Sequence, residues 1–128
     1  MNLSGARYAL RDLLAVKTGV QVVANPPRQL VAPVTIFFGA RTGNRETQGG
    51  GEMVTIPVFV AVPELTDDQF DALDDFIDGD RSIIDIIDAN PTPEEGVAFT
   101  VSGEWSEQEI EVGSTRHLAV AFTVQARF

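Results

Sequence analysis

The stretch that decides the fold runs from residue 53 to residue 62 and reads MVTIPVFVAV. Every second residue from Val54 to Val62 is a β-branched aliphatic residue, whereas the residues between them are mixed in character. Because successive side chains of a strand point to opposite faces, this alternation predicts a strand with one face in a hydrophobic core. Pro57 lacks a backbone donor, so we expect an edge or a bulge at that position.

Four further segments have the composition of strands. Residues 20–23 are rich in valine and end before Pro26 and Pro27. Residues 34–38 (VTIFF) are β-branched or aromatic without helical periodicity, as in a central strand that is covered on both faces. Residues 97–105 and 118–128 alternate apolar and polar side chains, which predicts the two arms of a long closing hairpin.

Three segments have helical periodicity. Apolar residues recur at intervals of three and four from Leu3 to Val16, which predicts an amphipathic N-terminal helix over residues 3–16. Thr66 and Gln69 form a capping box that begins an acidic helix over residues 67–78. Ser82 can cap a short helix that ends at Ala89, before Asn90 and Pro91.

The order of these segments predicts the fold class. The 128 residues are the length of one domain, which we place over residues 1–128. The order α, β, β, β, α, α, β, β predicts an α+β fold, in which the N-terminal helix and the central helices pack on one face of a mostly antiparallel sheet of four to five strands. Residues 39–52 contain almost nothing that can be buried, so we expect a flexible loop at about 40–52.

Charge is divided unevenly along the chain. Nine basic and nineteen acidic residues give a formal net charge of −10, which disfavours non-specific binding to DNA. Residues 1–51 hold six basic and two acidic residues, a net charge of +4. Residues 52–128 hold three basic and seventeen acidic residues, a net charge of −14. The chain is therefore an electrostatic dipole along its sequence.

Composition also excludes several classes of site. The chain has no cysteine and one histidine, so disulfides, thiolate nucleophiles and iron–sulfur clusters are excluded, and metal ligation by nitrogen or sulfur is almost excluded. The first residues show no secretory pattern, and no stretch approaches the roughly 20 apolar residues of a membrane span. We therefore expect a soluble protein that is made in a cytoplasm.

The acidic helix raises the hypothesis of a metal site. Six aspartates lie between residues 67 and 78, and hard cations bind carboxylate oxygens, as in a small carboxylate-dependent metal enzyme. However, a straight exposed helix splays its carboxylates apart, and no Asp-x-Asp-x-Asp-Gly loop is present. We favour a solvated face, or a face that meets the basic N-terminal half of a neighbouring subunit.

Two other clusters contain residue types that occur in catalytic or phosphate sites. His117 lies near Glu111, Ser114 and Thr115, but all four belong to one hairpin, whereas a catalytic triad needs elements that converge from separate loops. A structural histidine at the start of a strand is the favoured interpretation. The glycines at 49–51 are followed by neither Lys nor Ser/Thr and precede a strand, so a flexible loop explains them better than a phosphate cradle does.

The aromatic residues of the predicted strands are expected in the core. A base-stacking platform needs a basic groove, and the β-rich half of this chain is strongly acidic. Trp105 is the aromatic residue that we expect to be partly exposed.

Taken in order, the segments resemble the tail terminator (tail completion) proteins of long-tailed bacteriophages over nearly the whole chain. The resemblance is carried by the order and length of the elements. They are the N-terminal helix, the short strand that ends in a Pro-Pro turn at 26–27, the apolar strand at 33–36, the Val-rich strand at 53–62, the acidic helix at 67–78, the helix at 82–89 and the closing hairpin at 97–128.

The resemblance implies a structural virion protein with no enzymatic activity and no cofactor. Members of this family form a ring, usually of six subunits, that caps the completed tail tube and docks to the head-side connector. The implied partners are further copies of the chain, the tail tube protein, and the connector or stopper protein. DNA only passes through the lumen, and no membrane is involved. The implied location is the head–tail junction of a virion that is assembled in the host cytoplasm.

Two alternatives remain open. One is another neck component, such as a head-tail stopper or a minor tail protein, because these proteins differ in docking surfaces that the sequence does not display. The other, from a different class, is the small carboxylate-dependent metal enzyme.

Three sets of residues are candidate contact sites in such a ring. The first is the loop that would grip the tube or connector, with the polar residues Arg41, Asn44, Arg45, Glu46 and Glu52. The second is a contact of opposite charges between neighbouring subunits, formed by Arg7, Arg11 and Lys17 against Asp67, Asp71, Asp74 and Asp78. The third is an acidic lumen that would not attract DNA phosphates, lined by Glu104, Glu107, Glu109 and Glu111 or by the acidic helix face.

Overall fold

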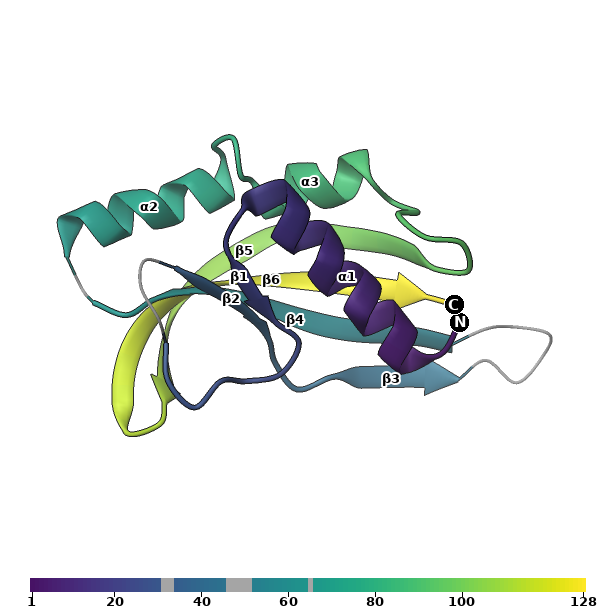
Figure 1. Cartoon of the computed structure of the whole chain (residues 1–128), viewed down its shortest axis with the longest axis horizontal. Coiled ribbons are helices and arrows are strands. Elements are labelled where there is room, and N and C mark those ends of the chain that lie inside the picture. Colours follow the sequence, from purple (N-terminus) through teal and green to yellow (C-terminus); the bar gives the residue numbers. More distant parts are fainter. Residues whose placement is uncertain (31–33, 46–51, 65) are drawn as a thin grey trace.

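The fold is seen in a computed structural model that describes residues 1–30, 34–45, 52–64 and 66–128 (Figure 1). Within these residues it has three helices and six strands. Their order is α1 (Leu3–Thr18), β1 (Gln21–Val23), β2 (Thr35–Phe38), β3 (Thr42–Arg45), β4 (Glu52–Val62), α2 (Asp67–Ile77), α3 (Ile83–Ala89), β5 (Ala98–Val112) and β6 (Thr115–Arg127). The predicted α+β class is confirmed.

The sheet is built around β4. Its strands follow the order β1-β2-β4-β6-β5, with β3 paired to β4 on the same side as β2. β1 and β2 are parallel, and all other pairs are antiparallel. The predicted alternation along β4 is confirmed, because every second residue from Val54 to Val62 is exposed by at most 5 %. β4 therefore presents an unbroken aliphatic face to the core.

Pro57 occupies a central strand, where proline is usually excluded. The backbone N–H of Gly39 donates to the Pro57 carbonyl over 2.9 Å. In an antiparallel strand the N–H and the C=O of one residue point to the same side. The missing N–H of Pro57 would therefore point toward residues 39–41, between Phe38 of β2 and Thr42 of β3, where no strand needs it as a donor. β4 itself has no bulge at Pro57, because its pairing with β6 is uninterrupted from Met53 to Val62. The break lies in residues 39–41 of the same chain, between β2 and β3.

Gly39 in that interval has no room for a side chain. A Cβ atom at this position would lie 2.6 Å from Cε2 of Phe59, on the face of the sheet that carries no helix. A side chain at position 39 would therefore force the Phe59 ring to move, which favours glycine here.

The prediction of a loop over residues 40–52 is wrong in part. Residues 42–45 form β3, which pairs antiparallel with residues 52–55 of β4. The sheet therefore has six strands instead of four or five, and four strands separate α1 from α2. The sequence of β3 is polar and has no apolar alternation, and its strand pairing with β4 is carried by the backbone. Residues 46–51 lie outside the described residues.

The helices cover one face of the sheet (Figure 1). Each helix begins at the predicted type of cap: the side chains of Asn2, Thr66 and Ser82 accept hydrogen bonds from the backbone N–H of Gly5, Gln69 and Asp85. α1 packs on β1, α2 on β4 and α3 on β5. The helix residues that are fully buried or nearly so are Ala6, Leu10, Leu14, Leu73, Phe76, Ile83 and Ile87. This layer is the main hydrophobic core.

The opposite face of the sheet carries a smaller apolar cluster. It contains Leu30, Phe37, Ala61, Val112 and Ala119. Phe37 also stacks on Phe59, with ring centroids 5.3 Å apart. Within the described residues no helix covers this face, yet these five side chains are exposed by at most 9 % because they pack against one another.

Truncation of Phe122 tests the core. Phe122 is 1 % exposed and lies opposite Val58 of β4 and Trp105 of β5. We expect Phe122→Ala to lower the free energy of unfolding by about 3 to 5 kcal/mol, because it removes a buried ring and leaves a cavity. Urea denaturation followed by circular dichroism measures this loss. The matched control is Thr123→Ala on the exposed face of the same strand, which should cost about 1 kcal/mol or less. Equal losses would contradict this assignment of the core.

Candidate interaction surfaces

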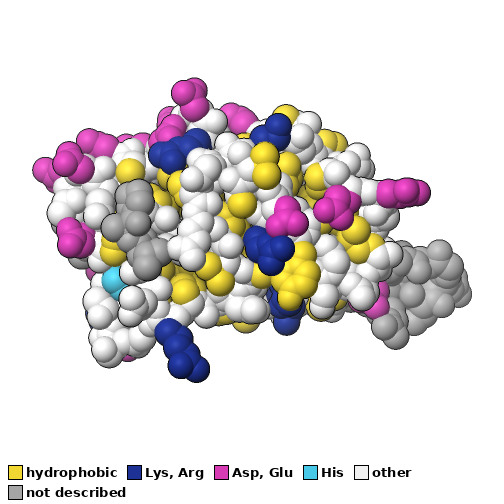
Figure 2. All heavy atoms as spheres, viewed as in Figure 1, with side chains coloured by type: hydrophobic (Ala, Val, Ile, Leu, Met, Phe, Trp, Pro, Cys, Tyr) yellow, Lys and Arg dark blue, Asp and Glu magenta, His cyan; other side chains and the backbone are white. Residues whose placement is uncertain are grey.

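The outer side of α1 combines exposed apolar and basic side chains. Tyr8 is 41 % exposed and Val16 is 79 % exposed. The guanidinium carbons of Arg11 and Arg7 lie 4.6 and 5.3 Å from the centroid of the Tyr8 ring, within the range of cation–π attraction. Figure 2 shows hydrophobic and basic side chains next to one another over α1. We call Tyr8, Val16, Arg7, Arg11 and Lys17 the α1 face.

Val16 contradicts its predicted place in the apolar stripe. The pattern from Leu3 to Val16 counts it among the core residues, but Leu14 is fully buried whereas Val16 is exposed. Two residues on a helix differ by about 200° in direction, so Leu14 and Val16 cannot both face the sheet. Tyr8 and Val16 are eight residues apart and share the outward side of α1.

Two of the three basic residues of the α1 face, Arg7 and Arg11, bind polar side chains of the same chain. Arg7 donates from Nη1 to Oδ1 of Asn25 over 3.2 Å. Arg11 donates from Nε to Oδ1 of Asp12 over 2.9 Å, an exposed ion pair. Lys17 is exposed in the last turn of the helix. With one acid among three basic residues, this surface keeps a positive charge.

The acidic row of α2 lies on the surface. Asp67, Asp71, Asp74 and Asp78 are all exposed, as their helical spacing predicts. The inner side of α2 buries Leu73 and Phe76, whereas Phe70, which the sequence places in the apolar stripe, is 39 % exposed. Figure 2 shows acidic side chains gathered at the end of the molecule where α2 lies.

Asp75 is bound within its own subunit. Nε of Arg81 donates to Oδ2 of Asp75 over 2.6 Å, and the guanidinium carbon of Arg81 lies 4.4 Å from the centroid of the Phe76 ring. The hydrogen bond from Arg81 holds the pKa of Asp75 below its ordinary value, against the opposing effect of burial. This ion pair fastens the end of α2 to the turn before α3.

A second acidic surface follows β5, the outermost strand. Within the described ranges β5 pairs with β6 alone, and residues 102–109 are exposed throughout. Trp105 is 46 % exposed, as the sequence predicts. Between Val101 and Trp105 the strand carries two residues more than β6 does, a bulge that bends it. We call residues 102–111, with their four glutamates, the β5 edge.

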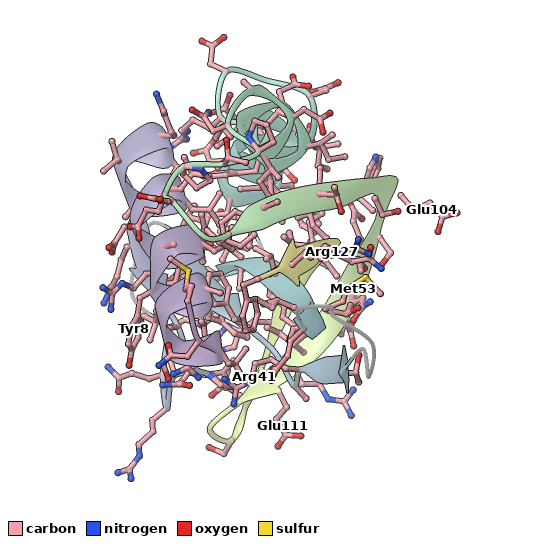
Figure 3. All side chains as sticks on the ribbon, turned by 90° about the vertical axis from the view of Figure 1, so that its right-hand side faces the viewer. Tyr8, Arg41, Met53, Glu104, Glu111 and Arg127 are labelled. Carbon is pink, nitrogen blue, oxygen red and sulfur yellow. The ribbon has the colours of Figure 1, made fainter. Side chains whose placement is uncertain are left out.

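The glutamates of the β5 edge are placed by strand geometry. Glu107, Glu109 and Glu111 lie at alternate positions and therefore share one side of the strand. Glu109 is 3.7 Å from Arg116, an exposed pair that contributes little to stability. Figure 3 shows Glu104 at the side of the molecule opposite α1.

A shallow hollow of about 250 Å³ lies beside Trp105. Its walls come from β4, β5 and β6 and include Pro57, Phe59 and Ala121. Glu104 and Ser106 border it on the β5 edge. The hollow therefore lies on the helix-free face, and Glu104 is the acidic residue that lines it.

The predicted partner-binding loop is only partly described. Arg41 is exposed immediately before β3, and the backbones of Asn44 and Arg45 lie opposite Met53 and Glu52 in β4. Glu52 and Phe128 exchange two backbone hydrogen bonds, of 2.7 and 3.0 Å, which ties this hairpin to the C-terminus. Glu46 lies outside the described residues.

His117 has the structural role that the sequence predicts. It is 8 % exposed, and its Nδ1 lies 3.0 Å from the Pro63 carbonyl oxygen, which fixes the start of β6 against the end of β4. Among the residues that the structure describes, no group of three or more histidine, aspartate or glutamate side chains is placed to hold a metal ion. None of the helices in these ranges is long and apolar enough to cross a membrane.

Comparison with known proteins shows which fold this chain shares. No protein-family model and no curated protein matches the sequence. Among solved structures, the chain is similar to a chain from the virion of a native gene transfer agent (GTA) particle. The TM-score is 0.53 at 14 % identity, and the alignment covers 98 % of this chain and 95 % of the other. At this identity the similarity shows a shared fold, which extends over both chains.

The ion pair between Asp75 and Arg81 should make the free energy of unfolding depend on pH. Because its pKa in the folded state is lowered, Asp75 stabilises the fold above the pKa of the unfolded state, and the contribution is lost as pH falls through the folded pKa. Asp75→Asn should therefore lower the free energy of unfolding by about 0.2 to 1 kcal/mol at neutral pH, and the difference from the natural protein should shrink in acid.

Urea denaturation at a series of pH values checks this expectation. The control is Asp74→Asn, whose carboxylate is exposed on the same helix. A difference for Asp75→Asn that stays constant into acid would contradict the assignment of the stabilisation to the charged carboxylate.

Proposed function

We propose that the protein is a structural virion protein, a tail terminator that forms a ring, of six copies as in the family it resembles, at the head–tail junction. The ring caps the tail tube and joins it to the head-side connector. The observation that carries this proposal is the fold shared with a chain of the gene transfer agent virion over 98 % of this chain. The order of elements, which resembles that of phage tail terminators, adds independent support.

The surfaces are also suited to assembly. Exposed tyrosine, tryptophan and arginine side chains are typical of protein interfaces, and this chain exposes Tyr8 and Trp105 on different elements. Basic residues gather on α1, whereas acidic residues gather on α2 and the β5 edge. A ring joins one surface of each copy to a different surface of the next, and opposite charges favour that arrangement.

The acidic surfaces also fit a passage for DNA. DNA is densely anionic, so a lumen lined by carboxylates offers its phosphates no attraction and lets it slide. Two exposed surfaces carry such carboxylates: the aspartate row of α2 and the glutamates of the β5 edge. We propose that one of them faces the channel.

The β3–β4 hairpin is the proposed contact with the tube or connector. It extends the sheet beyond β2, and Arg41 is exposed at its base. The polar side chains predicted for this contact are suited to the rim of an interface, where they set orientation and partner choice.

Electron microscopy of the purified protein with tail tubes tests the function. In negative stain we expect hollow rings alone or at one end of each tube, with the capped end able to bind the head-side connector. Gel-shift measurements at low salt should show no binding of double-stranded DNA outside the ring. Binding to the connector in the absence of tubes would identify a stopper, and the lack of any ring beside tubes would contradict the terminator.

A charge reversal in the hairpin tests the tube contact. We expect Arg41→Glu to weaken tube capping by about tenfold, the effect of roughly 1.4 kcal/mol of lost contact energy. The thermal transition should not change, because Arg41 is exposed. Capping is measured by counting capped tubes over a protein titration. The control is Arg28→Glu, which makes the same charge change at an exposed position outside the hairpin. Equal capping by both variants would exclude the hairpin as the contact.

Substitution is preferable to deletion for this test. Residues 43–45 belong to β3 and pair with β4, so a deletion of residues 43–50 removes strand pairing as well as contact side chains. The exchange of one exposed side chain keeps the register of the sheet.

A further inference from the structure

Two surfaces of the chain expose large apolar side chains beside charges of opposite sign. On α1 they are Tyr8 and Val16, next to Arg7 and Arg11. On the β5 edge the exposed apolar residue is Trp105, which lies in a strand segment with four glutamates. Apolar groups rimmed by charge are typical of protein interfaces, and Tyr, Trp and Arg are the residue types that contribute most binding energy there.

These two surfaces lie at opposite edges of the sheet. α1 packs against β1, the first strand in the sheet order, whereas β5 is the last. Figure 3 shows Tyr8 on one side of the molecule and Glu104 on the other. Complementary surfaces on opposite sides of one chain join copies head to tail, and such a contact forms a ring when the rotation closes.

Both surfaces are prepared for contact before assembly. The two guanidinium groups that flank Tyr8 restrict the orientation of its ring, which lowers the conformational entropy lost on binding. Trp105, which is 46 % exposed, shares its side of β5 with Glu107 and Glu109. β5 also presents the unpaired backbone groups of an edge strand.

Protection of the sheet edge alone does not explain these residues. Charged side chains on an edge strand prevent unwanted pairing, and the four glutamates would suffice for that purpose. Trp105 has the opposite effect, because an exposed indole in an edge strand promotes contact. Beside the acidic row of α2, the exposed aromatic residue is Phe70, which is less exposed than Trp105 (39 % against 46 %).

We propose that neighbouring copies of this chain meet by seating the α1 face of one copy on the β5 edge of the next, with Tyr8 and Val16 against Trp105. Arg7 and Arg11 then lie near the glutamates of the β5 edge. This inference rests on the proposed ring and identifies its contact surfaces. It replaces α2 with the β5 edge as the partner of the basic residues, and it leaves the aspartate row of α2 to face the channel.

Disulfide trapping tests this contact, because the natural chain has no cysteine. The variant carries Val16→Cys and Ser106→Cys, one on each proposed surface, both at exposed positions. Under mild oxidation at high protein concentration, we expect a ladder of covalent oligomers on a non-reducing gel. Each single variant should give at most a symmetric dimer. The matched control, Val16→Cys with Phe70→Cys, tests the contact between α1 and α2 and should also stop at the dimer.

Each result of the trapping experiment either supports or overturns the contact between the α1 face and the β5 edge. A ladder only from the 16/106 pair supports the inference, whereas a ladder from the 16/70 pair or from neither pair overturns it. The proposed function is judged separately, by rings on tail tubes in negative stain. If rings form on tubes but the cross-link runs through residue 70, the proposed contact is wrong and the terminator function stands. If the cross-link runs through residue 106 but no tube is capped, the contact stands and the terminator function is wrong.

A mixing experiment gives an independent readout. One variant, Tyr8→Ala with Arg11→Glu, loses the α1 face, and the other, Trp105→Ala with Glu107→Lys, loses the β5 edge. Each retains one intact surface, so an equal mixture should form heterodimers and nothing larger, while each variant alone sediments as a monomer. Circular dichroism confirms that both fold. Oligomers in either variant alone would contradict the head-to-tail contact.

Discussion

The fold depends on the burial of one face of β4. Its alternating aliphatic residues meet the helix layer on one side, and the strand pairs with β2 and β3 along one edge and with β6 along the other. Because a shift of one residue would turn every aliphatic side chain of β4 away from the core, the pattern also fixes the register of its partners. Through β6 it determines where the β5 edge lies, and therefore where Trp105 and the glutamates are presented.

Strands and helices that bury side chains could be predicted, because burial leaves a period in the sequence. The aliphatic alternation of β4 is such a period. The helix starts could be predicted from a different signal, the capping residues Asn2, Thr66 and Ser82. β3 could not be found in this way, since its strand geometry comes from backbone hydrogen bonds to β4 and its side chains carry no apolar pattern.

The interaction surfaces could be predicted only in part. The division of charge between the two parts of the chain was visible in the sequence, and the partial exposure of Trp105 was expected. The exposure of Val16 was not, because an apolar residue at the margin of a helical stripe has the same spacing whether it faces the core or solvent. The positions of α1 and β5 at opposite edges of the sheet follow from strand order, which is a property of the folded chain.

The net charge of −10 sets a condition on any assembly of identical copies. Like-charged subunits repel one another, but at physiological ionic strength the screening length is about 8 Å, so distant charges contribute little and contacting surfaces dominate. A surface that combines an apolar anchor with a charge opposite to its partner can overcome this repulsion locally, as the α1 face and the β5 edge are arranged to do. An acidic surface that takes no part in such contacts keeps its charge uncompensated. In the ring that we propose, the aspartate row of α2, exposed and without a basic partner in its own helix, is the surface that would face the channel for DNA.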